Sequence, residues 1–163
     1  MTCICFVTNE IYPVTPGGAG SLIFNLTREL LSEQQRVVLL LNVSKAAFDR
    51  FKRSELEQLP NPKNCCVYHV DELCRAAPFA ESDFQSRFIW ESARYDYACR
   101  QVYEKERPDR IEFVDYNGPA YAAICAKIAG LSYQTALMTV RMHGPVELID
   151  RFAMTKPIDF DRL

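Results

Sequence analysis

The sequence predicts an α/β fold of the Rossmann-like type, in which helices cover both faces of a parallel sheet. Short apolar runs alternate with amphipathic helical segments along the whole chain, which is the pattern of strands joined by right-handed helical crossovers. A glycine-rich loop separates the first apolar run from the first helix. With 163 residues, 48% of them hydrophobic and 25% charged, the composition is that of one globular domain.

The expected strands are short and almost continuously apolar, as strands buried on both faces of a parallel sheet should be. They cover residues 3–8, 37–43, 65–70, 110–115 and 134–142.

The helices are expected from apolar residues at helical spacing and from their start and stop signals. Ser44 can cap the second helix and Pro60 ends it. The longest helix, 84–106, has an apolar stripe that predicts its buried side: Phe84, Phe88, Tyr95, Cys99, Val102 and Tyr103. The other expected helices are 18–34, 44–59, 119–129 and 146–152, while 71–83 is predicted to be loop or short helix.

Net charge and hydropathy argue against two classes of partner. The formal net charge of −2 is no general footprint for nucleic acid or an anionic membrane. The amino terminus lacks the features of a signal peptide, and no apolar stretch approaches the roughly 20 residues that span a bilayer. We therefore expect a cytoplasmic protein without a transmembrane segment.

Seven cysteines are present, and no two of them form a C-x-x-C pair. Reduced thiols buried in a cytosolic protein explain them best. A zinc site is the alternative, but the spacing that zinc ligands show is absent, so we expect no metal.

Polar residues follow the expected strands at the edge where ligands bind in open parallel α/β sheets. Asn42 ends the second strand. Residues 115–118, Asp-Tyr-Asn-Gly, end the fourth strand, and residues 141–145, Arg-Met-His-Gly-Pro, end the fifth. This grouping predicts a binding site at the carboxyl edge of the sheet.

The glycine-rich loop, residues 16–21, opens the first helix. Backbone N–H groups of Gly17, Gly18, Ala19 and Gly20 would then be available to an anion such as phosphate. The alternative is an ordinary turn before a helix. The loop matches neither the P-loop nor the G-x-G-x-x-G pattern. A turn plugged by the protein's own side chains and pointing away from His143 and Asp115 would overturn the phosphate role and the function built on it.

Other side chains near this edge have two interpretations each. His143 is interpreted as a donor to a sugar hydroxyl or to developing charge, or as a strand-end residue with satisfied hydrogen bonds. Asp115 is interpreted as a ligand contact or base, or as a helix cap. Glu10 and Tyr12 are interpreted as acceptor contacts or as parts of a solvated loop. Arg141 is expected to have a structural role.

The order of several motifs resembles the amino-terminal domain of family 4 glycosyltransferases with the GT-B fold. The matching pieces are Phe6-Val7-Thr8, Tyr12-Pro13, Pro16-Gly17-Gly18-Ala19-Gly20, the helix with Asn25-Leu26 and Glu29-Leu30, Arg107-Pro108-Asp109, Val114-Asp115-Tyr116 and Val140-Arg141-Met142-His143-Gly144.

This resemblance implies a retaining enzyme of the hexosyltransferase class in glycan biosynthesis, with two Rossmann-like domains and no metal or other cofactor. Its partners would be a nucleotide-sugar donor and a sugar or glycan acceptor. The resemblance places the glycine loop, Gly17 to Gly20, against the donor diphosphate and sugar. It makes His143 and Asp115 the candidate catalytic residues and Glu10, Tyr12, Tyr116 and Asn117 the candidate acceptor contacts.

The second GT-B domain, with its paired glutamates, is missing from the sequence. We therefore expect residues 1–163 to be one truncated half, inactive without the carboxy-terminal domain. A nicotinamide- or flavin-binding Rossmann domain is one alternative, but there the glycines should follow the strand directly and an acid should stand where Asn42 does. A non-catalytic α/β interaction module is the other.

Overall fold

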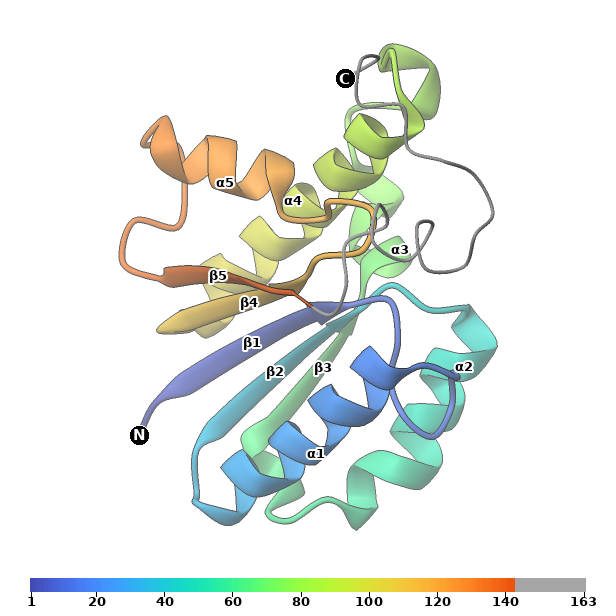
Figure 1. The fold of residues 1–163 in the computed structure, drawn as a ribbon, viewed down its shortest axis with the longest axis vertical. Helices are drawn as coiled ribbons and strands as arrows, with labels where there is room; N and C mark the ends of the chain where they lie inside the picture. Colours follow the sequence, from blue (N-terminus) through green and yellow to red (C-terminus); the bar gives the residue numbers. More distant parts are fainter. Residues whose placement is uncertain (143–163) are drawn as a thin grey trace.

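Five parallel strands form one sheet in the order β3-β2-β1-β4-β5 (Figure 1). The computed structural model describes residues 1–142, so the helix expected at 146–152 lies outside the described residues. The Rossmann-like parallel sheet predicted from the sequence is confirmed. The strands are β1 (Cys3–Thr8), β2 (Arg36–Leu41), β3 (Cys65–His69), β4 (Arg110–Val114) and β5 (Leu137–Arg141).

The central strand β1 pairs with β2 on one side and β4 on the other. Phe6 lies opposite Leu39 in one pair and opposite Glu112 in the other. Strands β1 and β2 are buried almost throughout, which explains why their sequences are continuously apolar instead of alternating.

Helices cover both faces of the sheet (Figure 1). On one face, α1 (Gly18–Ser32) and α2 (Lys45–Arg50) bury apolar side chains such as Ile23, Leu31 and Phe48 against β1 and β2. On the other, α3 (Val70–Leu73), α4 (Arg87–Glu106) and α5 (Tyr121–Ile128) pack on a second core. Each core is lined by alternate residues of the same strands, so Phe6 faces the first core and Val7 the second.

Two expected helices differ in detail from the prediction. The segment 44–59 begins as α2, with Ser44 Oγ accepting from the Ala47 N–H at 3.3 Å, and continues as a π-helical turn, Phe51–Glu55, and a 3₁₀ turn, Leu56–Gln58. The long helix α4 begins at Arg87 because Ser86 caps it, accepting from the Phe88 N–H at 3.2 Å.

Phe88 was expected on the buried side of this helix, and that prediction is wrong. Its side chain is 63% exposed, while Tyr95, Cys99 and Val102 are buried. The first turn of α4 lies beyond the carboxyl ends of the strands, so the sheet covers only the later turns.

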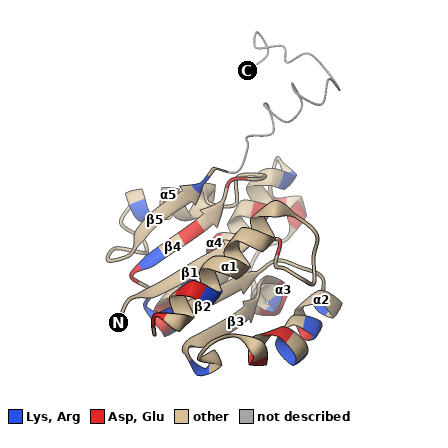
Figure 2. Ribbon diagram, turned by 60° about the horizontal axis from the view of Figure 1, so that its bottom comes forward, with Lys and Arg blue, Asp and Glu red and all other residues tan. Residues whose placement is uncertain are grey.

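The buried carboxylate of Glu112, on β4, ties β5 to the sheet. Arg110 Nη2 donates to Glu112 Oε2 at 3.0 Å, and Arg141 Nε donates to Glu112 Oε1. Figure 2 shows acidic and basic segments next to each other on β4. A buried charge is tolerated when it is paired in this way, and Arg141 has the structural role expected for it.

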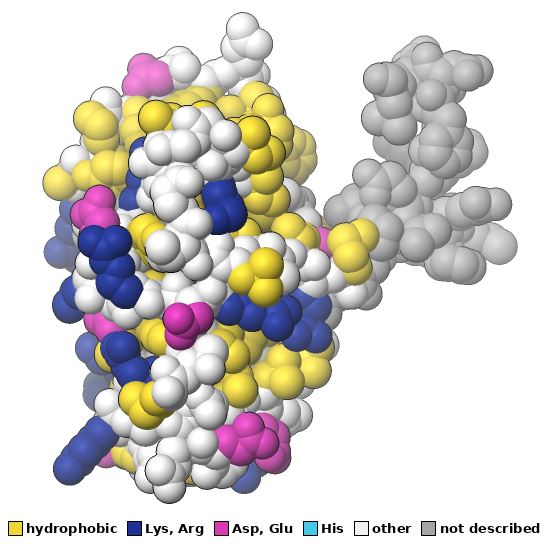
Figure 3. Space-filling model, turned by 90° about the vertical axis from the view of Figure 1, so that its left-hand side faces the viewer, with side chains coloured by type: hydrophobic (Ala, Val, Ile, Leu, Met, Phe, Trp, Pro, Cys, Tyr) yellow, Lys and Arg dark blue, Asp and Glu magenta, His cyan; other side chains and the backbone are white. Residues whose placement is uncertain are grey.

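The side of the molecule that carries α5 and β5 is rich in exposed apolar side chains. Figure 3 shows them gathered over the upper part of this face, where α5 lies. Ile128 and Leu131 are 82% and 70% exposed, and Leu137 on β5 is 60% exposed. Within residues 1–142, the structure contains no helix that combines the length and hydropathy needed to span a membrane.

All seven cysteines are free thiols, and four of them are buried in the two cores. Burial raises the pKa of the Cys65 and Cys99 thiols from 9.0 to about 12, and the pKa of Cys5 is also well above its ordinary value. The native state therefore holds these protons at a pH where an unfolded chain releases them.

This difference predicts a loss of stability in alkali. The free energy of unfolding should be unaffected by these thiols below pH 9 and should fall as the pH rises from 9 towards 12, because the unfolded state then binds fewer protons. Urea unfolding at pH 7.5 and at about pH 10.5 measures the decline. The fall in the free energy of unfolding between these pH values should be smaller in Cys99→Ala than in the parent. In the control Cys125→Ala, whose cysteine is exposed, the fall should equal that of the parent. Equal declines in the parent and both variants would contradict the account.

Candidate functional site

A cavity of about 480 Å³ opens at the carboxyl edge of the sheet. After β1 the chain passes through α1 to β2, which lies on one side of β1. After β3 it passes through α4 to β4, which lies on the other side of β1. The crevice between β1 and β4 is therefore the switch point of the sheet, where open α/β sheets bind their ligands. The cavity is lined by Asn9, Asn42, Arg87, Phe88, Glu91, Tyr95, Tyr116 and Asn117.

Half of this lining comes from the segments that follow strands. Asn9 follows β1, Asn42 follows β2, and Tyr116 and Asn117 belong to the turn after β4. That turn is closed by the Gly118 N–H donating to the Asp115 carbonyl at 3.1 Å, and Asn117 has a φ of 62°. The sequence predicted this grouping, because parallel strands bring their carboxyl ends to one edge.

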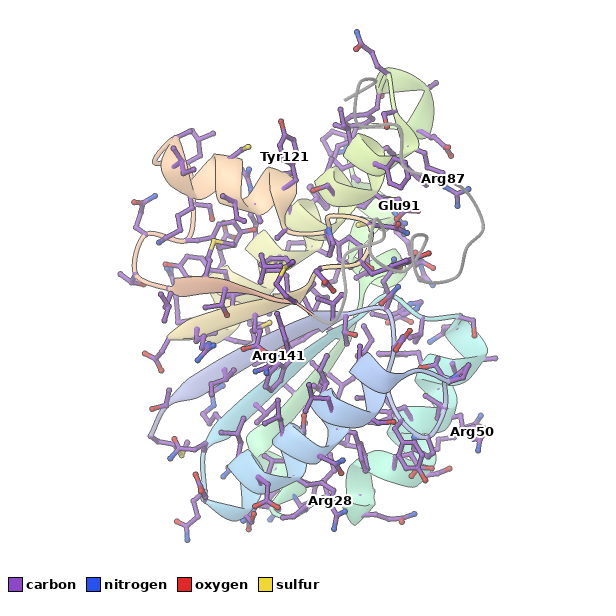
Figure 4. All side chains as sticks on the ribbon, viewed as in Figure 1. Arg28, Arg50, Arg87, Glu91, Tyr121 and Arg141 are labelled. Atoms are coloured by element: carbon purple, nitrogen blue, oxygen red, sulfur yellow. The ribbon has the colours of Figure 1, made fainter. Side chains whose placement is uncertain are left out.

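The other half of the lining is the first three turns of α4. Arg87 and Glu91 lie one turn apart and point to the same region of the molecule (Figure 4). Glu91 Oε1 is 4.0 Å from Arg87 Nε, and Glu91 Oε2 accepts from Arg94 Nη1 at 2.8 Å. Glu91 is thus an anion between two cations at the wall of the cavity.

Tyr95 and Asn42 join the two halves of the site. Asn42 Nδ2 donates to the Tyr95 hydroxyl at 2.9 Å. Burial raises the pKa of Tyr95 to about 12, so this phenol stays protonated at neutral pH. Because the hydroxyl accepts in the bond to Asn42, its own proton remains to be donated to another group.

Sequence reasoning missed the contribution of α4. Arg87, Glu91 and Tyr95 recur every four residues, which places them on one side of a helix. The apolar residues of the same helix were interpreted as a single buried stripe. Ser86 is the sequence signal that could have shown this. It is a capping residue, and it predicts a helix that starts at Arg87 instead of at residue 84.

The glycine loop is occupied by a side chain of the protein itself. Glu10 Oε2 accepts from the Gly20 N–H at 3.2 Å. A Cβ on Gly17 would lie 1.9 Å from the same oxygen and would displace the Glu10 carboxylate, and the φ of 136° at Gly17 favours glycine there. The carboxylate of Glu10 thus takes the place at the start of α1 where a phosphate was expected.

The preceding loop holds Glu10 in this position. Thr8 Oγ1 accepts from the Glu10 N–H at 3.1 Å and donates to the Glu10 carbonyl at 3.0 Å. The Tyr12 N–H donates to the Gly20 carbonyl at 3.3 Å. A phosphate would therefore reach the loop only if the Glu10 side chain moved out of it.

The structure separates the predicted site residues into groups. Tyr116 and Asn117 line the cavity, whereas Glu10 and Tyr12 do not; Tyr12 packs against Phe24 with 5.6 Å between ring centroids. Asp115 is half-buried beside the cavity residues, and the N-cap position of α5 is occupied by Ala120. His143 lies outside the described residues.

His69, at the end of β3, packs in the core with one of its two ring nitrogens in a hydrogen bond. It is buried and its Nε2 lies 2.7 Å from the Val43 carbonyl oxygen, which shows that it packs as a core residue. Its Nδ1 has no hydrogen-bond partner within the described part of the chain.

Residues 1–142 contain no group of three or more His, Cys, Asp and Glu side chains arranged to hold a metal ion. Comparisons with protein-family models, curated proteins and solved structures found no match to this chain.

Helix α1 lies close to the backbone of residues 10–11, so substitutions of two of its glycines should have different effects. A Cβ on Gly20 would lie 2.9 Å from the Ile11 backbone nitrogen, so Gly20→Ala should destabilise the protein by about 1–3 kcal/mol. A Cβ on Gly18 meets nothing within 4 Å, so Gly18→Ala should be neutral or stabilising by up to about 1 kcal/mol. Chemical denaturation measures both, and equal effects of the two substitutions would show that α1 does not pack closely on the loop.

Proposed function

We propose that this chain is the acceptor-side domain of a retaining glycosyltransferase that uses a nucleotide-sugar donor. The observation that carries the proposal is the cavity at the carboxyl edge, whose lining is rich in amide and hydroxyl groups. Its volume of about 480 Å³ lies in the range of small-molecule sites. The order of motifs that resembles family 4 glycosyltransferases supplies the reaction class.

The lining chemistry suits a sugar. A sugar hydroxyl both donates and accepts hydrogen bonds, so it is best matched by groups that do the same. Asn9, Asn42 and Asn117 each offer a side-chain carbonyl and an NH₂ group, and Tyr95 offers a hydroxyl. Glu91 adds an acceptor and Arg87 adds donors. Such a set binds hydroxyls from several directions.

Three observations disfavour the dinucleotide-binding alternative. Residues 9–15 separate β1 from the glycine loop, and β2 is followed by Asn42 instead of an acid. In addition, Glu10 brings a negative charge to the position that a pyrophosphate would need.

The contact between Glu10 and the glycine loop also bears on how the proposed enzyme would bind its donor. In the proposed enzyme, the glycine loop from Gly17 to Gly20 meets the donor diphosphate from across the cleft, and Glu10 must first leave the loop because two anions repel each other there. The transferred sugar then exchanges its bond to the diphosphate for a bond to an acceptor oxygen, and the proton of the acceptor hydroxyl passes to the released nucleoside diphosphate. Asp115 and His143 are the residues proposed to act on the transferred sugar.

The class of ligand can be tested by NMR titration of the whole chain. We expect a mixture of oligosaccharides to shift the amide signals of Asn9, Asn42 and Asn117, and we expect NAD and FAD to leave them unchanged. Asn42→Ala should weaken the saccharide shifts, whereas Asn25→Ala, an exposed asparagine on α1, should not. Shifts with NAD or FAD at these residues, and none with saccharides, would favour the dinucleotide-binding domain and overturn the proposal.

A further inference from the structure

Resting on the function proposed above, the geometry points to the chemical class of the acceptor. We infer that the acceptor is an uncharged saccharide, and that faces of its rings stack on Phe88 and Tyr116 at the mouth of the cavity. The inference depends on two independent observations, the exposure of these aromatic side chains and the charge balance of the lining.

Phe88 and Tyr116 both line the cavity and both expose most of their surface. Phe88 is 63% exposed and Tyr116 is 51% exposed. They come from different elements, the first turn of α4 and the turn after β4. Exposed aromatic side chains beside a polar cavity indicate a surface that is covered when a ligand is present.

Sugar rings have the complementary surface. The faces of a pyranose ring carry C–H groups, whereas its hydroxyls project around the edge. A ring lying against Phe88 or Tyr116 therefore buries its C–H face on the aromatic side chain and directs its hydroxyls to the polar groups deeper in the cavity. Tyr95 and Asn42 lie among those polar groups.

The charges of the lining favour a neutral ligand. Among the described residues that line the cavity, Arg87 is the one cation and Glu91 is the one anion, and they lie 4.0 Å apart. The second cation near the site, Arg94, forms ion pairs with Glu91 and with Asp71. Among the described residues, no surplus positive charge remains at the cavity for a phosphate, sulfate or carboxylate group of an acceptor.

A nucleobase is a competing ligand for the aromatic side chains, because it also presents a flat face. Nucleotides, however, bring phosphates, and the charges of Arg87 and Arg94 beside the cavity are balanced by those of Glu91 and Asp71. The balance of charge therefore favours the saccharide.

The inference can be tested on a printed array of neutral, sulfated and phosphorylated oligosaccharides, followed by titration of the bound compounds. We expect binding to neutral members. Phe88→Ala and Tyr116→Ala should each weaken it about threefold to tenfold, the loss expected for one aromatic contact. Phe88→Tyr should retain the affinity, because it keeps the ring.

Tyr121→Ala is the matched control. Tyr121 is 61% exposed and begins α5, but it does not line the cavity, so its removal should leave the affinity unchanged. Because all these side chains are exposed, the variants should fold, and thermal unfolding of each one verifies this.

Each outcome separates the inference from the proposed function. Binding only to sulfated or phosphorylated members would overturn the inference and leave the glycosyltransferase proposal in place. The same holds for neutral binding that Phe88→Ala and Tyr116→Ala do not weaken. Failure to bind any saccharide, together with NMR shifts caused by NAD or FAD, would overturn both.

Discussion

The parallel pairing of β1 with both β2 and β4 is the constraint from which the rest of the structure follows. A strand paired in this way on both sides needs crossovers that leave in opposite directions and lie on opposite faces. The helices then form two separate layers, and the ends of the central strands are left open between them. The cavity occupies that opening, so its position is a consequence of topology.

The glycines of the loop at the start of α1 are explained by contacts within the protein as well as by a possible anionic ligand. Glycines at the start of a helix permit an anion to approach the backbone, and in this structure the anion is the carboxylate of Glu10. Position 17 favours glycine because of its positive φ, and a glycine there leaves room for that carboxylate. Position 20 needs glycine because α1 lies against the backbone of Ile11. These internal contacts account for two of the glycines without any ligand. The phosphate role of the loop therefore remains a proposal that requires Glu10 to move.

Helix α4 belongs to the core along most of its length and to the site in its first turns. Its later turns bury Cys99 and Val102 against the sheet, while Arg87, Phe88 and Glu91 line the cavity. Tyr95 stands between the two parts, with its ring buried and its hydroxyl bonded to Asn42. An element that is held rigidly by the core can present polar side chains with little freedom, which reduces the entropy that a ligand must overcome on binding.

The sequence by itself determined the fold class, the order of helices and strands, and the edge at which polar residues gather. It could do so because apolar periodicity and the chemistry of helix starts are local properties of the chain. It placed Tyr116 and Asn117 at this edge for the same reason, since both belong to the turn that follows β4. Only the tertiary structure decided that Phe88 is exposed, that Glu10 fills the glycine loop, and that α4 forms a wall of the cavity. These facts depend on how far a helix extends past the sheet and on which side chains meet across it, and both are set by packing between segments that are distant in the chain.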